Sequence, residues 1–110
     1  MSYDRMNTHI SIAEVVVTKD AEGFAVKSDN ILKSVKAYRE GRHGSQKWFN
    51  RAAFSEATDL FRLRVIPGLS VTTAHVILCG DDRFEITSVE DVKGRGMYLE
   101  LLGKRMTADG

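Results

Sequence analysis

The chain has very little cysteine and proline, and each scarcity narrows the classes of protein to which it can belong. One cysteine, Cys79, and one proline, Pro67, occur among 110 residues. A lone cysteine cannot form an internal disulfide, which excludes a small disulfide-held scaffold and is typical of a reducing compartment. Low proline together with nine glycines indicates strands punctuated by tight turns.

Long apolar runs and a strong charge of one sign are also missing. No apolar stretch approaches the roughly 18 residues of a membrane-spanning helix. The opening residues, MSYDRMNTHI, lack the apolar core of a secretory signal. The net charge is +1, so the chain as a whole makes no electrostatic case for nucleic acid. We expect one domain of ordinary globular composition, with no membrane partner.

Catalytic and metal-binding patterns are missing as well. His75 and Cys79 lie four residues apart on a predicted strand, which separates them by roughly 13 Å, beyond hydrogen-bond reach. The other histidines, His9 and His43, fall on different segments without ligand spacing. We expect no enzyme activity, no metal and no cofactor, and we interpret Cys79 as a core residue.

The sequence does contain a succession of short β-branched and alternating segments. In the clearest, AHVILCGDDRFEITSV, a Gly/Asp turn joins an apolar run to an alternating run, which is typical of a β-hairpin. The segment TDLFRLRVI also alternates, with Arg62 and Arg64 expected to point outward. Strands are predicted over residues 9–19, 31–38, 58–66, 74–79, 83–89 and 97–102, a short strand or crossing piece over 24–27, and turns at 19–23, 29–30, 67–68, 80–82 and 90–96.

The long segment between the predicted strands at 31–38 and 58–66 has a different pattern. Residues 39–44 hold two glycines and several charges, which predicts a loop, and Ser45 is a suitable cap for a short helix over residues 46–53. The predicted fold is all-β: a small antiparallel β-barrel or sandwich of about six strands with a long loop and a short helical insertion. The expected organisation is a flexible arm (1–8), a single barrel domain (9–104) with its insertion at 39–57, and a tail (105–110).

Charge is segregated along the chain although its sum is near zero. Basic residues dominate residues 33–51, and acidic residues dominate residues 81–91. Three interpretations remain open for the two clusters. They are two solvated surfaces, two complementary surfaces of identical neighbours, or a basic loop that touches a nucleic-acid backbone. The candidates for contact with DNA or a subunit are Arg39, Arg42, His43, Lys47 and Trp48, and the candidates for the acidic complementary surface are Asp81, Asp82, Glu85, Glu90 and Asp91.

Three segments, taken in order, resemble the head–tail joining family of tailed bacteriophages, also described as head completion, adaptor or stopper proteins. Residues 61–104 resemble the family's closing part: an Arg-bearing strand, an apolar strand, a G-x-x-[YF]-x-I-x-S-V hairpin and an L-x-L strand. Residues 31–52 are similar to its W-A-S-V strand and following loop, although Lys33 replaces the small residue and the tryptophan is missing. Residues 9–23 are similar to its opening strand and D-x-x-G turn. The hairpin and closing-strand positions match at Gly80, Phe84, Ile86, Ser88, Val89, Leu99 and Leu101.

The resemblance implies a structural part of the virion and not a catalyst. It implies a homo-oligomeric ring, hexamer or dodecamer, that closes the DNA-filled head, with the portal or adaptor above and a tail terminator or tail protein below. Assembly would take place in the bacterial host cytoplasm. The loop at residues 39–48 would then lie near packaged double-stranded DNA or near an acidic neighbouring subunit. The alternative function is an OB-like small β-barrel that binds nucleic acid, for which the near-neutral net charge is unfavourable.

Overall fold

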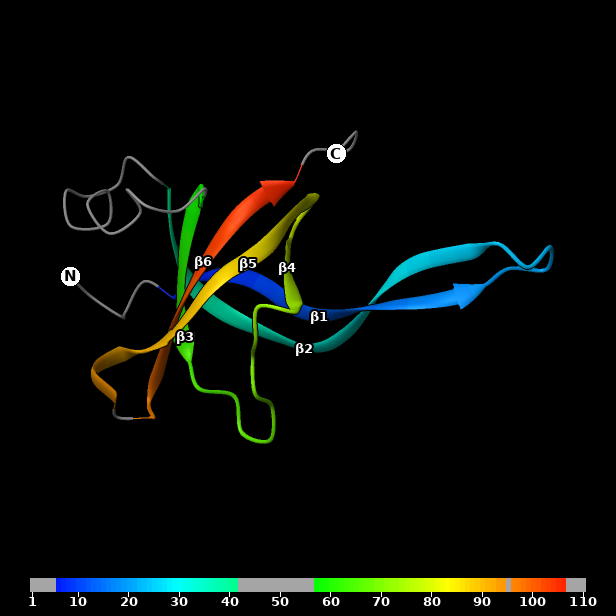
Figure 1. The fold of residues 1–110 in the computed structure, drawn as a ribbon. Helices are drawn as coiled ribbons and strands as arrows, with labels where there is room; N and C mark the ends of the chain where they lie inside the picture. The colour runs from blue at the N-terminus through cyan, green and yellow to red at the C-terminus, as the bar shows by residue number, and fades with distance from the viewer. Residues whose placement is uncertain (1–5, 42–56, 95, 107–110) are drawn as a thin grey trace.

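Six antiparallel strands close into one barrel in the order β1-β2-β3-β6-β5-β4, with β4 pairing back onto β1 (Figure 1). The computed structural model of the chain describes residues 6–41, 57–94 and 96–106. The predicted fold class is confirmed by this topology. The strands are β1 (Thr8–Lys19), β2 (Ala25–Gly41), β3 (Asp59–Arg64), β4 (His75–Cys79), β5 (Asp82–Asp91) and β6 (Tyr98–Met106).

The barrel interior is filled by alternate residues of every strand, as the period of two along a strand requires. At its centre the rings of Phe61 and Phe84 meet edge to face, with centroids 5.0 Å apart and an interplanar angle of 72°. Gly103 on β6 allows this contact, since a Cβ there would lie 3.1 Å from the Cβ of Phe84. The buried apolar residues around the pair are Ile10, Ile12, Ala37, Leu63, Ile66, Val71, Ile77, Cys79, Ile86 and Leu101.

A long two-stranded ribbon extends from one side of the barrel (Figure 1). It consists of the second half of β1 and the first half of β2, which pair from Ala13↔Ile31 to Lys19↔Ala25. Strand β4 accompanies β1 only over Ser11–Glu14, so in the described structure the ribbon beyond Glu14 has no third strand. The ribbon explains the elongated dimensions of 51 × 30 × 22 Å.

The prediction of a turn at residues 29–30 is wrong, since β2 runs without interruption through this position. The expected crossing piece at 24–27 and the expected strand at 31–38 belong to one strand of 17 residues. Asp29 and Asn30 are turn-forming residues, but the backbone at both stays paired with β1. The Asn30 side-chain amide donates a hydrogen bond of 2.9 Å to Glu14, which shows that its polar group is satisfied outside the ladder.

The outward arginines predicted on the third long strand separate into two cases. Arg64 is exposed, as expected. Arg62 points away from the barrel core but is buried, with 8% of its surface exposed, and pairs with Glu100 on β6. The alternating pattern therefore predicted the correct face of the strand for Arg62, but it wrongly predicted that the side chain is exposed.

The ends of several strands also differ from the expectation. The closing strand, predicted to end at residue 102, continues to Met106 because β6 pairs with β5 as far as Arg83↔Met106. The turn expected at residues 90–96 is shorter: β5 continues to Asp91 and a 3-10 turn follows over Val92–Gly94. Gly68, with φ of +80°, fits the predicted Pro67-Gly68 turn. The helix predicted at 46–53 lies outside the described residues.

Candidate functional site

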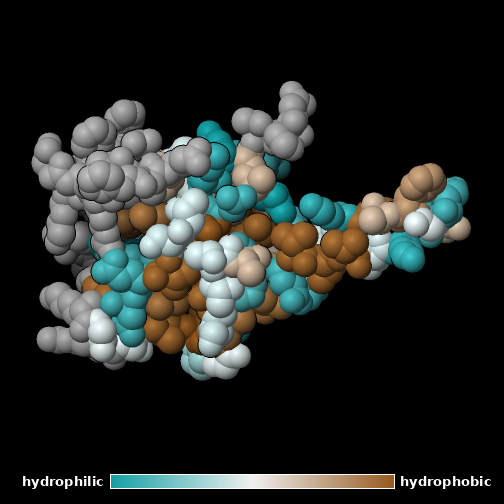
Figure 2. All heavy atoms as spheres, viewed as in Figure 1, coloured by the Kyte–Doolittle hydropathy of each residue, from teal (hydrophilic) through white to brown (hydrophobic). Residues whose placement is uncertain are grey.

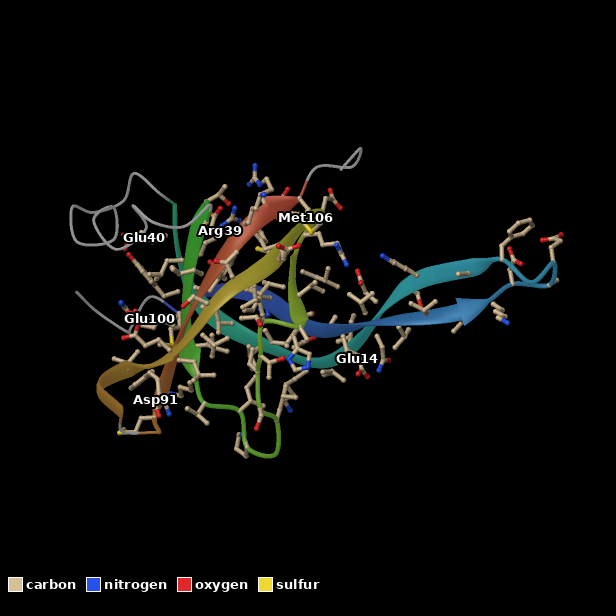
Figure 3. All side chains as sticks on the ribbon, viewed as in Figure 1. Glu14, Arg39, Glu40, Asp91, Glu100 and Met106 are labelled. Atoms are coloured by element: carbon tan, nitrogen blue, oxygen red, sulfur yellow. The ribbon has the colours of Figure 1, made fainter. Side chains whose placement is uncertain are left out.

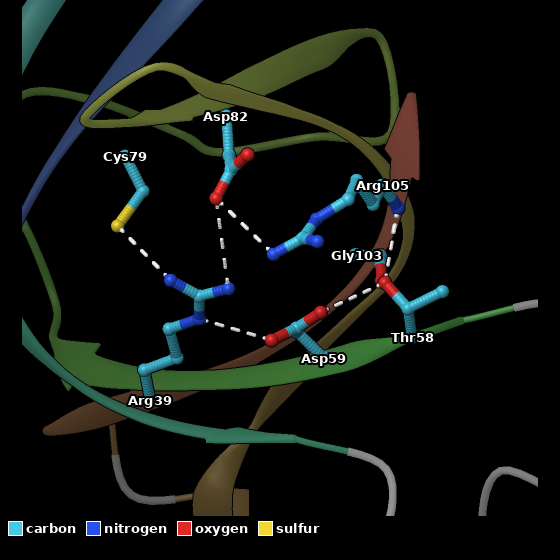
Figure 4. Close-up of polar contacts among 7 residues, drawn as sticks. All are labelled: Arg39, Thr58, Asp59, Cys79, Asp82, Gly103 and Arg105. Carbon is cyan, nitrogen blue, oxygen red and sulfur yellow. Dashed lines mark hydrogen bonds and ion pairs between the residues drawn. The ribbon is translucent and has the colours of Figure 1, made fainter. Parts of the chain in front are cut away.

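One end of the barrel is closed by charged side chains instead of apolar ones (Figure 4). Arg39 on β2, Asp59 on β3, Asp82 on β5 and Arg105 on β6 converge there from four strands. The Arg39 Nε–H donates to Asp59 Oδ2 at 2.9 Å, and Asp82 Oδ2 lies 4.0 Å from Arg39 Nη2 and 3.1 Å from Arg105 Nη2. We name these four residues the polar plug.

The polar plug is supported by the aromatic core beneath it. The Arg39 guanidinium lies 5.2 Å from the ring centroid of Phe84 and 5.9 Å from that of Phe61, and Arg105 lies 5.8 Å from Phe84. A guanidinium stacked on an aromatic face at such distances is attracted by the ring quadrupole. The plug therefore forms one layer with the core and fixes the relative positions of β2, β3, β5 and β6 at this end.

The electrostatics of the plug keep Arg39 charged. Burial lowers the pKa of Arg39, but the hydrogen bond and charge of Asp59, with a smaller part from Cys79, outweigh burial and raise the pKa. The Arg39 Nη1–H also donates to Cys79 Sγ at 3.6 Å. Thr58 adds an Oγ1–H donor to Asp59 Oδ1 at 2.8 Å, so that this buried carboxylate has partners on both oxygens.

This geometry corrects the expectation for Arg39. The sequence placed Arg39 at the start of a mobile loop, free to touch DNA or a neighbour, whereas the structure places it within β2 and bonded inside the chain. It points into the barrel end (Figure 3). The other members of the predicted basic loop, Arg42, His43, Lys47 and Trp48, lie outside the described residues, and their role stays a prediction.

The predicted acidic surface is split between several environments. Asp82 belongs to the polar plug, and Asp91 accepts the backbone N–H of Gly96 at 3.0 Å in the turn before β6. Asp81, Glu85 and Glu90 are exposed. One basic candidate, Arg39, and one acidic candidate, Asp82, thus form an ion pair within a single chain.

Replacing Arg39 with methionine tests the structural role of the plug. The change keeps the length of the side chain and leaves the buried Asp59 without its guanidinium, for which we expect a loss of about 1–3 kcal/mol in the free energy of unfolding. Arg105→Met is the matched control, because the Arg105 side chain is 49% exposed and its ion pair contributes at most about 1 kcal/mol. Chemical denaturation measures the free energy of unfolding of both variants. Equal losses in the two would contradict the structural role assigned to Arg39.

A second charged group lies on the outer face of the barrel. The Arg62 Nε–H donates to Glu100 Oε2 at 2.9 Å, and the guanidinium lies 5.8 Å from the ring of Tyr38. The Tyr38 hydroxyl donates to Glu40 Oε1 at 2.7 Å. The other oxygen of Glu40 is buried and has no hydrogen-bond partner among the described residues. The sequence gave no signal for this group, since each of its members alone resembles a solvated strand residue.

A further ion pair lies near the base of the projecting ribbon. Arg83 donates two hydrogen bonds to Asp29, at 2.9 and 3.1 Å, from the start of β5 to the middle of β2. The hydrogen bond from Arg83 lowers the pKa of Asp29, and the same contact raises the pKa of Arg83. The pair fixes the direction in which the ribbon leaves the barrel.

The described residues hold no constellation of the kind that binds a metal. No group of three or more His, Cys, Asp or Glu side chains in residues 6–41, 57–94 and 96–106 is placed to hold an ion. In the same residues no helix has the length and apolar character to cross a membrane. What the arrangement offers chemically is ion pairing and apolar contact at surfaces.

Comparison with known proteins relates the chain to a family of phage proteins. The sequence profile of a family described as phage head completion protein matches residues 1–105. The fold is similar to the solution structure of protein SF1141 from Shigella flexneri 2a, with a TM-score of 0.69 and 14% identity over 98% of this chain and 99% of that one. It is also similar to a chain in the virion of a native gene transfer agent particle, with a TM-score of 0.62 and 21% identity over 94% of this chain and 98% of that one. No curated protein matches the chain.

Proposed function

The chain belongs to the phage head completion protein family, and from that premise we propose that it forms a homo-oligomeric ring that closes the DNA-filled head and docks the tail. The family match over residues 1–105 carries the proposal, since it includes every strand of the barrel. The chain is accordingly a structural component of the virion. The ring itself, its place below the portal or adaptor, and a tail protein as its lower partner are parts of the proposal.

The architecture supports a mechanical role. Within the barrel every strand pairs with a neighbour on both sides, and the polar plug adds ion pairs among four strands at one end. A barrel of this kind keeps its shape while its outer surfaces contact neighbouring proteins. A ring component that holds back packaged DNA needs this rigidity more than it needs a cleft.

Contact with packaged DNA is proposed for the loop after β2. Its candidate residues Arg42, His43, Lys47 and Trp48 follow directly after Gly41, where β2 ends. Lys and Arg side chains neutralise backbone phosphates without reading sequence, which suits a channel through which the whole genome passes. The acidic flank of a neighbouring subunit is the competing contact for the same side chains.

Removing the chain from the phage that encodes it tests the proposal. With an amber stop codon early in the gene, a non-suppressing host should yield heads that package DNA, lose it again and carry no tails. Expression of the wild-type chain in the same host should restore tailed, infectious particles. Electron microscopy and a nuclease-protection assay measure the two phenotypes. Normal tailed particles without the chain would rule the proposal out.

A further inference from the structure

The exposed apolar side chains of this protein are concentrated on the projecting ribbon. Of the large apolar residues that are exposed in the described structure, Met97 alone lies elsewhere. The others on the ribbon and its turn are Val15, Val17, Phe24, Val26 and Ile31. Figure 2 shows apolar atoms at the base of the ribbon and again toward its tip. A two-stranded ribbon is marginally stable alone in water, and contiguous exposed apolar surface usually marks an interaction site.

The tip of the ribbon is a well-defined turn that presents one aromatic ring. Asp20 Oδ1 accepts the backbone N–H groups of Glu22 at 3.0 Å and Phe24 at 2.9 Å, and Gly23 supplies the positive φ of 84°. Phe24 is 69% exposed, the largest exposure among the large apolar residues that the structure describes. Between Asp20 and Phe24 the charged side chains are both acidic. The tip is therefore a preformed apolar anchor in a turn that carries two carboxylates, with Lys19 beside it at the end of β1.

A cavity with the opposite charge lies on the barrel. Its volume is about 560 Å³, and its lining joins the middle of β2 to the end of β3 and the turn that follows. For comparison, a cavity of about 150 Å³ can hold a benzene ring. Three cations and an apolar floor line it, from Lys33, Lys36, Arg64, Val35, Ile66 and Pro67. Neither Lys33 nor Lys36 has an ion-pair partner in the described structure.

We propose that the ribbon tip of one copy docks in this basic cavity of the next copy, with Phe24 in the cavity and Asp20 and Glu22 beside its cations. The inference rests on the proposed ring. Shape and charge both favour a second copy as the occupant, since the chain itself carries the anchor and a matching receptor. The ribbon projects away from the barrel that holds the cavity (Figure 1). Two different surfaces then meet, and such a heterologous contact generates a ring when the rotation closes.

A photo-crosslink from the tip tests this contact in the assembled particle. Phe24 is replaced by p-benzoylphenylalanine through amber suppression in the infected host, and purified particles are irradiated. We expect dimers of this chain, with the cross-link mapped by mass spectrometry to Val35, Ile66 or Pro67. Cross-links to another virion protein, or to the acidic residues of β5, would overturn the inference and leave the proposed ring standing. Absence of the chain from particles would overturn both.

Charge reversal tests the pairing independently. Glu22→Lys and Lys36→Glu should each lower the yield of cross-linked dimer roughly two- to fivefold, and the double reversal should restore it, because an exposed ion pair contributes modestly. Asp81→Lys is the matched control, since Asp81 is exposed in a turn outside the tip. This substitution alone should leave the yield of cross-linked dimer unchanged. Restoration of the Lys36→Glu yield by Asp81→Lys, in place of Glu22→Lys, would contradict the assignment.

Removing the anchor completes the test. Because Phe24 is exposed in the single chain, Phe24→Ser should leave the thermal unfolding of the isolated protein unchanged. An aromatic anchor that becomes buried in an interface is typically a hot spot. When copies assemble on an isolated portal ring, the affinity between copies of the variant should therefore be about thirtyfold lower than between wild-type copies. Equal incorporation of the variant and the wild-type chain would contradict the proposed docking.

Discussion

Replacing Phe61 with alanine is expected to lower the free energy of unfolding by about 3–5 kcal/mol, the usual loss for a buried phenylalanine. Phe61 has no exposed surface and meets Phe84 edge to face. The change removes the apolar transfer free energy of the ring and leaves a cavity that a closed barrel cannot easily collapse. Since a domain of this size is stable by about 5–15 kcal/mol, the variant should melt more than about 10 °C lower.

Phe24 is the matched control for Phe61, because it is a phenylalanine at an exposed position. Phe24→Ala removes the same atoms from a side chain that is 69% exposed, so the isolated protein should change by less than about 0.5 kcal/mol. Urea denaturation followed by circular dichroism measures both variants. A small loss for Phe61→Ala, or similar losses for the two, would contradict the assignment of the aromatic pair as the centre of the core.

Replacing Arg62 with methionine is expected to cost a similar amount, about 3–5 kcal/mol, by a different mechanism. Arg62 and Glu100 are 8% and 6% exposed, and the guanidinium neutralises the carboxylate across β3 and β6. Methionine keeps the volume of the side chain but removes the guanidinium that pairs with the buried carboxylate of Glu100.

Two further variants distinguish this mechanism from a general loss of packing. Arg64→Met lies two residues along the same strand at an exposed position, and it should change stability by less than about 0.5 kcal/mol. The double variant Arg62→Met with Glu100→Leu should recover most of the loss, because removing both charges ends the desolvation cost. No recovery in the double variant would show that the pair itself is not the source of the effect.

The β class and the main strands could be predicted from the sequence because each depends on local patterning. Alternation placed Phe84 and Ile86 inside, and the Gly80-Asp81 turn fixed the central hairpin. The uninterrupted course of β2 could not be predicted. Asp29 and Asn30 favour turns locally, whereas pairing with β1 and the contacts with Glu14 and Arg83, all distant in sequence, hold them in a strand.

The sequence showed where charged residues are concentrated along the chain, but it did not show which of them are in contact. The segregation of basic and acidic residues identified Arg39 and Asp82, but their meeting depends on barrel closure, which brings β2 and β5 to the same end. Asp59 and Arg105 gave no signal, since each is an ordinary charge on a strand. The ribbon was missed for a related reason: its length depends on where β4 stops accompanying β1.

Together these features describe a barrel with an interior that stabilises it and a ribbon that reaches beyond it. The aromatic pair, the polar plug and the buried Arg62–Glu100 pair account for a stable body. The exposed apolar residues of the ribbon are left without a role in the isolated chain. The proposed contact between copies would give them one, through the same residues that define the tip.

Imaging the neck of the mature phage particle by cryo-electron microscopy tests the central claim most directly. The account predicts a closed ring of this chain between the head and the tail, in which each ribbon crosses to the adjacent barrel. Density for the chain as scattered single copies, or a neck complete without it, would contradict the account.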